Sequence, residues 1–180
     1  VKLHGEAFFS VMHKENNQKF IVRSGDLSIE VLGTAFNVNN RRGNNKVILN
    51  EGSVRLDLSS IDWRDGDQSG ESYLLMEPGE MVEVNEDDKE ISKKIVNPAI
   101  YSSWTENVLI FDKTPLEEVI KMIEDNYGYA VYTNNLNVED LDFTGELYSS
   151  ELSLILEYLS ETFDLQIKKE NNKIILIKND

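Results

Sequence analysis

The amino-acid sequence predicts an α+β protein in two parts. Residues 1–97 are expected to form an all-β sandwich or solenoid-like domain, and residues 98–180 a small β-α-β-β-α-β-β domain with a duplicated helix-strand unit. The duplication is strong fold information, because a repeated unit must fold the same way twice. The first part shows short alternating segments and no sustained helical period. Asn97-Pro98 separates the two patterns, since the residue before a proline is driven out of the helical region.

The two copies of the repeated unit lie 36 residues apart. In each copy four apolar residues follow the spacing i, i+3, i+4, i+7 of one helix face, and two more alternate as on a strand. The matched residues are Leu116, Val119, Ile120, Ile123, Tyr127, Tyr129 and Val131 in the first copy, and Leu152, Ile155, Leu156, Leu159, Phe163, Leu165 and Ile167 in the second. Two amphipathic helices of about three turns need a sheet to cover them. We therefore expect both helical stripes to be buried.

Helix-boundary residues support this interpretation. Thr114 is suited to the N-cap and Glu117 to the third helical position, so the first helix is expected to begin with a capping box. Gly128 suits the left-handed position that ends it. In the second copy Ser150 takes the place of the cap.

The N-terminal part repeats a simpler pattern. Gly5, Gly25 and Gly52 each precede a segment with apolar residues at alternate positions, and Gly79 opens a similar segment that slips by one. The alternating residues are Ala7, Phe9, Val11, Leu27, Ile29, Val31, Val54, Leu56, Leu58, Val82 and Val84. Such strands bury one face and expose the other. Gly33 interrupts the run Val31 to Val38, and we expect a bulge or corner there.

Composition excludes several functions. The chain carries a net charge of −15, which disfavours binding to nucleic acid or to an anionic membrane surface. It has no cysteine, which removes disulfides, thiolate zinc sites and cysteine nucleophiles. His4 and His13 stand at opposite ends of a predicted strand, and Asp62, Asp65 and Asp67 lack the spacing of an EF-hand. No catalytic or nucleotide-binding motif occurs. We expect neither an enzyme nor a bound metal or cofactor.

The second predicted helix has an additional apolar stripe. Glu118 and Met122 of the first helix correspond to Leu154 and Tyr158 of the second, so the second helix is apolar over more of its circumference. This stripe needs cover, either from the β domain or from another protein. Leu154 and Tyr158 are therefore candidate partner-binding residues.

The strand after the first helix is the other candidate. It is rich in tyrosine and valine, and we expect its residues Tyr129, Val131 and Tyr132 to lie at a sheet edge. An exposed edge can accept a strand from another protein, which is β-augmentation.

A carbohydrate-binding β module is the alternative function. Trp63, Tyr73 and Tyr101 would then serve as platforms on which sugar rings stack. Loss of glycan binding on Trp63→Ala would favour this alternative.

An ordered set of motifs resembles a known family across essentially the whole chain. The motifs are Gly5-Glu6-Ala7-Phe8-Phe9, the run Val31 to Val38, Glu51-Gly52-Ser53-Val54, Glu77-Pro78-Gly79-Glu80, Trp104, the run Phe111 to Leu116 with Val119 and Ile120, and Phe143-Thr144-Gly145. Together they resemble the periplasmic part of FecR-family anti-sigma regulators of the Bacteroidetes type. The C-terminal motifs are similar to the secretin and TonB short N-terminal domain.

The resemblance implies a cell-surface signalling regulator. In the family a cytoplasmic segment holds an extracytoplasmic-function sigma factor, a membrane helix follows, and the periplasmic part receives a signal from a TonB-dependent outer-membrane transducer. This chain would be the periplasmic sensor part, and the segment and the helix would precede it. The chain starts at Val1, in what looks like mid-strand sequence, as expected for a piece of a longer protein. The family supplies no catalytic residues.

Overall fold

The computed structural model describes residues 1–59, 73–85, 90–148 and 151–179. These residues form two units, Val1–Ser102 (unit 1) and Ser103–Asp180 (unit 2). The class is α+β, as the sequence predicts, with strands in both units and the long helices in unit 2. The acidic loop with Trp63 and its three aspartates lies outside the described residues.

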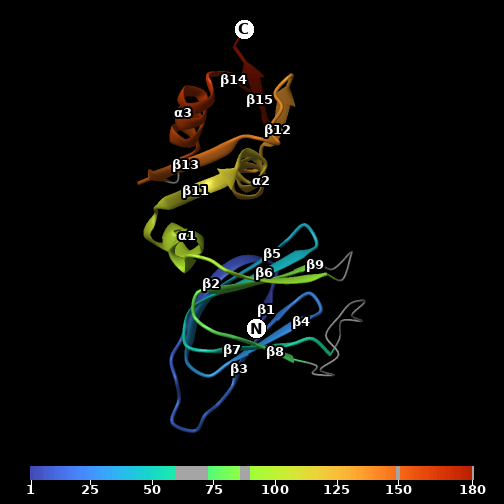
Figure 1. The fold of residues 1–180 in the computed structure, drawn as a ribbon, viewed down its shortest axis with the longest axis vertical. Coiled ribbons are helices and arrows are strands. Elements are labelled where there is room, and N and C mark those ends of the chain that lie inside the picture. Colours follow the sequence, from blue (N-terminus) through green and yellow to red (C-terminus); the bar gives the residue numbers. More distant parts are fainter. Residues whose placement is uncertain (60–72, 86–89, 149–150, 180) are drawn as a thin grey trace. The chain divides into compact units, whose positions relative to one another are not determined.

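Unit 1 consists of two five-stranded sheets (Figure 1). Sheet A has the order β1 (Lys2–Leu3), β3 (Phe20–Ser24), β4 (Leu27–Val31), β7 (Val54–Asp57) and β8 (Tyr73–Met76). Sheet B has the order β10 (Ile91–Ile95), β9 (Glu80–Asn85), β6 (Asn44–Glu51), β5 (Thr34–Arg41) and β2 (Gly5–Val11). Neighbouring strands are antiparallel except for β1 and β3.

One hydrophobic core lies between the two sheets. Its buried residues include Leu27, Ile29, Val31, Val54 and Leu56 from sheet A, and Phe36, Val38, Val47, Leu49, Val82 and Val84 from sheet B. Alternate residues of each strand point into this core because successive strand side chains face opposite sides. Sheets that share a core face to face have the arrangement of a sandwich. On the other side of sheet A, Ile21, Arg23, Arg55 and Leu75 are exposed.

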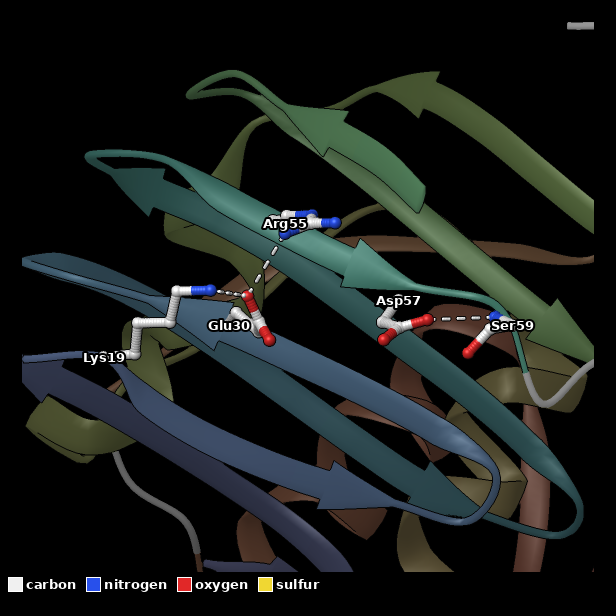
Figure 2. A network of polar contacts seen from close by, with 5 residues as sticks. All are labelled: Lys19, Glu30, Arg55, Asp57 and Ser59. Atoms are coloured by element: carbon white, nitrogen blue, oxygen red, sulfur yellow. Dashed lines mark hydrogen bonds and ion pairs between the residues drawn. The ribbon is translucent and has the colours of Figure 1, made fainter. Parts of the chain in front are cut away.

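Polar contacts occupy the outer face of sheet A. Figure 2 shows Glu30 between two cations, with Oε2 at 2.8 Å from Lys19 Nζ and 3.6 Å from Arg55 Nη1. On the same sheet, hydrogen bonds from the hydroxyl and the backbone N–H of Ser59 hold the pKa of Asp57 below its usual range. Exposed ion pairs of this kind add little stability. This face is therefore a solvated surface.

Gly33 occupies the corner between β4 and β5, as the sequence predicts, and the reason is close packing. A Cβ at this position would stand 2.6 Å from His13 Cβ, so a side chain has no space. Gly52 lies against the same corner: its own Cβ would stand 2.5 Å from the Gly33 carbonyl oxygen, and its φ is 91°. Both positions therefore require glycine.

A short helix, α1 (Pro98–Ser102), packs against β6 and belongs to unit 1. The Asn50 side-chain amide donates a hydrogen bond of 3.0 Å to the hydroxyl of Ser102. The predicted break at Asn97-Pro98 thus precedes the helix, and the structural units divide after it.

Unit 2 begins with a 3-10 turn, η1 (Ser103–Glu106), and continues as a β-α-β-β-α-β-β chain. Its elements are β11 (Leu109–Pro115), α2 (Leu116–Tyr127), β12 (Ala130–Asn134), β13 (Asp142–Leu147), α3 (Leu152–Phe163), β14 (Leu165–Glu170) and β15 (Lys173–Lys178). Sheet C pairs β11 with β13, and sheet D has the order β12-β15-β14. Each helix contacts strands of both sheets, so the helices supply the apolar side chains that join the sheets.

The helical stripes are buried to different degrees. The α2 stripe of Leu116, Val119, Ile120 and Ile123 is buried throughout. In α3 only Ile155 and Leu159 are buried. Leu152 and Leu156 are partly buried against the core, so the prediction of full burial is wrong for these two residues.

The predicted capping box is also wrong. Thr114 belongs to strand β11, and α2 begins after Pro115 without a side-chain cap. The first helical N–H, of Leu116, instead donates 2.7 Å to the carbonyl of Leu141, because tertiary pairing supplies the acceptor. At the other end Gly128 has the predicted left-handed conformation, with φ 71°. Ser150 lies outside the described residues.

Candidate partner-binding surface

The second apolar stripe of α3 is partly open to solvent. Tyr158 exposes 44% of its surface. Leu154, one turn earlier, is partly buried. Neither residue belongs to the hydrophobic core of unit 2, whereas Ile155 and Leu159 on the neighbouring face are fully buried within it. The structure thus brings the two predicted residues together as a separate apolar surface, which we call the α3 stripe.

Strand β12 lies at an edge of sheet D, with β15 on its only paired side. Tyr129, just before β12, and Val131 pack against the core. Tyr132 exposes 46% of its surface. Lysines of the neighbouring hairpin lie over both tyrosine rings: Lys169 Nζ is 4.5 Å from the Tyr129 ring centre and Lys173 Nζ is 5.5 Å from that of Tyr132. Cation–π contacts of this type fix the orientation of half-exposed rings.

The β12 edge is already partly occupied. The backbone N–H of Val131 donates 3.1 Å to Oε1 of Glu124, a side chain of α2. A partner strand at this position would have to displace that carboxylate. Sequence reasoning did not foresee this bond, because Glu124 has the pattern of an exposed helix residue.

Sheet D has a second edge that the sequence analysis missed. Strand β14 pairs only with β15, and the hairpin they form carries Lys168, Lys169, Lys173 and Lys178. Residues 103–180 contain six lysines and sixteen acidic residues, so four of the six lysines lie on this one hairpin. The uneven distribution of lysines was a visible signal in the sequence.

Tyr148 is a further exposed aromatic residue of unit 2, with 75% of its surface accessible. Its hydroxyl donates 3.0 Å to Oε2 of Glu146. This hydrogen bond to the carboxylate raises the pKa of Tyr148. Tyr148 follows β13 and lies on neither of the two predicted surfaces.

The residues of unit 2 that resemble the family motifs help to build its fold. The rings of Phe111 and Phe143 pack edge to face at 5.0 Å. Between Phe111 and Thr114 the register of β11 shifts, and the backbone N–H of Lys113 donates 2.9 Å to the Thr144 hydroxyl. These residues build sheet C and its bulge.

Two of the three stacking platforms of the alternative function, Tyr73 and Tyr101, lie among the described residues. The Arg55 guanidinium lies 4.4 Å above the ring centre of Tyr73, where a sugar would stack. Tyr101 belongs to α1, and Trp63 lies outside the described residues. Within the same residues no group of three potential metal ligands converges. None of the described helices has the length and hydrophobicity needed to cross a bilayer.

Comparisons with known proteins find family models that match parts of both units. The family model "FecR protein" matches residues 1–55, and "FecR, C-terminal" matches residues 108–176. Two crystal structures of a candidate anti-sigma factor from Parabacteroides distasonis ATCC 8503 are similar, at 28% identity. The 1.65 Å structure has a TM-score of 0.76 and the alignment covers 99% of this chain and 80% of that one. The 2.50 Å structure has a TM-score of 0.75, with 99% and 79% covered. No curated protein matches the chain significantly.

The chain has a β unit followed by an α+β unit, and its fold is similar to that of a candidate anti-sigma factor. Anti-sigma factors are a regulatory, non-enzymatic class of protein. The two family models match the two units separately. The chain belongs to the FecR family of anti-sigma factors. Its role is that of an anti-sigma regulator.

Proposed function

We propose that this chain is the periplasmic sensor part of a membrane-anchored anti-sigma regulator. It receives a signal from a TonB-dependent outer-membrane transducer and thereby controls an extracytoplasmic-function sigma factor. The sigma factor binds a segment upstream of this chain, and a membrane helix connects that segment to the sensor. The match to both FecR models, over residues 1–55 and 108–176, carries this proposal.

Unit 2 is the part that binds the transducer's periplasmic signalling domain. Its surface offers what a protein partner needs: an apolar α3 stripe with a half-exposed tyrosine, and a small sheet with two edges. Buried aromatic anchors often supply much of the binding energy of an interface. No cofactor takes part, because the regulator acts through protein contacts alone.

Calorimetry with the purified signalling domain of the co-encoded transducer tests the proposal. We expect the wild-type chain to bind, and Tyr158→Ala to weaken binding by roughly 2 kcal/mol if the α3 stripe is in the interface. Tyr148→Ala is the matched control, since it removes another exposed tyrosine from the same unit. Wild-type affinity in Tyr158→Ala would remove the α3 stripe from the interface.

The β12 edge needs a different variant. Val131→Pro would remove a donor that already bonds Glu124, so a loss of binding could come from disturbed packing. Thr133→Pro instead removes the next edge-facing N–H, because Ala130 and Tyr132 direct theirs toward β15. If no co-encoded signalling domain binds the wild-type chain, the proposed function itself is wrong.

A further inference from the structure

The lysine-bearing edge strand β14 keeps its outward backbone groups free of hydrogen bonds to other described residues, whereas β12 has one of its outward N–H groups, that of Val131, bonded to Glu124. In an antiparallel pair, residues alternate between those that bond their neighbour and those that point their N–H and C=O away. The Asn179 N–H donates to the Asp164 carbonyl, which makes Asp164 and Asn179 a hydrogen-bonded pair. By alternation, Gln166 and Lys168 also bond β15. The backbone N–H and C=O groups of Ile167 and Lys169 therefore point away from β15. No described residue bonds the outward N–H and C=O groups of these two residues. They form a short docking edge.

The charge of this hairpin opposes that of its unit. Residues 165–178 carry four lysines and one glutamate, a net charge of +3, within a unit of net charge −10. None of the four lysines forms an ion pair with a carboxylate among the described residues, although the unit has an excess of acids. Lys168 and Lys169, on opposite faces of β14, are both exposed. Lys169 and Lys173 contact tyrosine rings, and all four cations still lack a carboxylate partner among the described residues. Cations without a carboxylate partner beside open backbone groups favour an extended segment that is acidic.

We propose that the β14 edge binds an acidic extended segment of the partner by strand addition. This inference rests on the proposed function, and it names the signalling domain of the transducer as the protein that supplies the segment. The segment pairs with the backbone of Ile167 and Lys169, and its carboxylates lie near Lys168 and Lys169.

Two other occupants fit less well. A second copy of the chain would bring its own Lys168 and Lys169 against this edge, and directly opposed like charges are unfavourable. The same lysines thus discourage edge-to-edge association of two copies while leaving the edge open to opposite charge. At the β12 edge, the Glu124 carboxylate both occupies the Val131 N–H and repels an acidic segment.

Residue-specific amide exchange measured by NMR on the full chain tests the site directly. Upon addition of the purified signalling domain, we expect the exchange of the Ile167 and Lys169 amides to slow by at least about 10-fold, because they become hydrogen-bonded. The Val131 amide, already bonded in the free chain, is expected to change little. A bound chain with unchanged exchange at both β14 amides would overturn the proposal.

Charge reversal tests the chemistry of the segment. Lys168→Glu with Lys169→Glu should weaken binding at least about 10-fold at ~0.05 M salt, with a smaller difference at ~0.5 M salt, because salt screens the attraction. The matched control, Lys113→Glu with Lys121→Glu, makes the same charge change elsewhere in unit 2. Wild-type affinity in the β14 double variant, or equal loss in both, would refute an acidic segment at this edge.

The outcomes separate this inference from the function on which it rests. If the wild-type chain fails to bind the signalling domain, the proposed function and the inference both fall. The wild-type chain could instead bind with slowed exchange only at the Thr133 amide, or with affinity lost only in Tyr158→Ala. The proposed function then stands, and β14 is not the docking edge. NMR spectra of each variant before titration show whether it is folded.

Discussion

The two units enclose their cores to different degrees. Among the described residues, the core of unit 1 has fourteen buried hydrophobic residues and six partly buried ones packed against it. The core of unit 2 has thirteen buried and eleven partly buried residues. The cores are thus similar in size, but unit 2 leaves nearly twice as many core-contacting apolar residues partly exposed.

The difference follows from architecture. In unit 1 two five-stranded sheets cover each other, and side chains of the central strands are fully buried between them. In unit 2 two helices contact sheets of two and three strands, which are too small to cover every apolar helix position. Partly exposed apolar surface is what binding sites are made from. The partly exposed core residues of unit 2 support its proposed role in partner binding.

The sharpest test of the closed core is Gly33→Val. A Cβ 2.6 Å from His13 Cβ cannot be accommodated without moving backbone, so we expect unit 1 to lose roughly 4 kcal/mol or more. Chemical denaturation followed by NMR would report the two units separately. We expect the resonances of unit 2 to keep their wild-type midpoint.

Gly145→Ala is the control for this prediction. A Cβ there would stand 3.9 Å from Phe143 Cζ, which is an ordinary contact. We expect a change below about 1 kcal/mol. A wild-type midpoint for Gly33→Val would show that the backbone at this corner moves to make room for a side chain. The core of unit 1 would then be packed less tightly than described.

Within unit 2 the contrast between the helices predicts unequal costs. Ile123→Ala should cost about 3 kcal/mol, because Ile123 is fully buried. Leu156→Ala, on the corresponding stripe of α3, should cost about 1 to 2 kcal/mol, because Leu156 is partly buried and water replaces part of the lost contact. Denaturant titration of both variants measures the difference. Equal costs would contradict the idea that α3 is only half covered.

Local periodicity explains why the stripes could be predicted. The spacing of apolar residues identified the buried face of α2 and the inward residues of β4, β7 and β9, since burial follows side-chain direction. The alternating residues of β2 are only partly buried. It overstated the burial of Leu152 and Leu156, because the amount of cover depends on the size of the opposing sheet. The local sequence of a helix does not show how large the opposing sheet is.

The candidate surfaces show the same limit. Tyr158 and the edge position of β12 were predicted from pattern, and the structure places both at the surface. Sheet D, however, is held by a parallel pairing of Ala130 with Lys173 and by a helix side chain bonding Val131. Such long-range pairings decide which edge is open, so β14 was missed.

Lowering the pH should reduce the stability of unit 1 through protonation of Glu80. Burial acts to raise the pKa of Glu80, but hydrogen bonds from Lys93 and the Glu77 N–H hold it below its usual value. A lowered folded-state pKa means stability that is present above the unfolded pKa and lost as pH falls through the folded one. Glu80→Gln should therefore lose about 1 kcal/mol near neutral pH, and this deficit should shrink as the pH is lowered through the acidic range. Denaturant titration of both proteins over a series of pH values checks this; a deficit that stays constant with pH would contradict it.

The smallest expected effect is at the start of α2. Because Thr114 lies in β11 and makes no capping bond, Thr114→Ala should change the stability of unit 2 by less than about 0.5 kcal/mol, whereas a true N-cap would cost about 1 kcal/mol. Gly128→Ala, at the other end of the same helix, should cost about 1 kcal/mol, because its φ of 71° strains any side chain. Thermal or denaturant unfolding of the pair compares them directly. A larger loss in Thr114→Ala than in Gly128→Ala would mean that the helix depends on its first turn for a cap, and that pairing with Leu141 does not replace it.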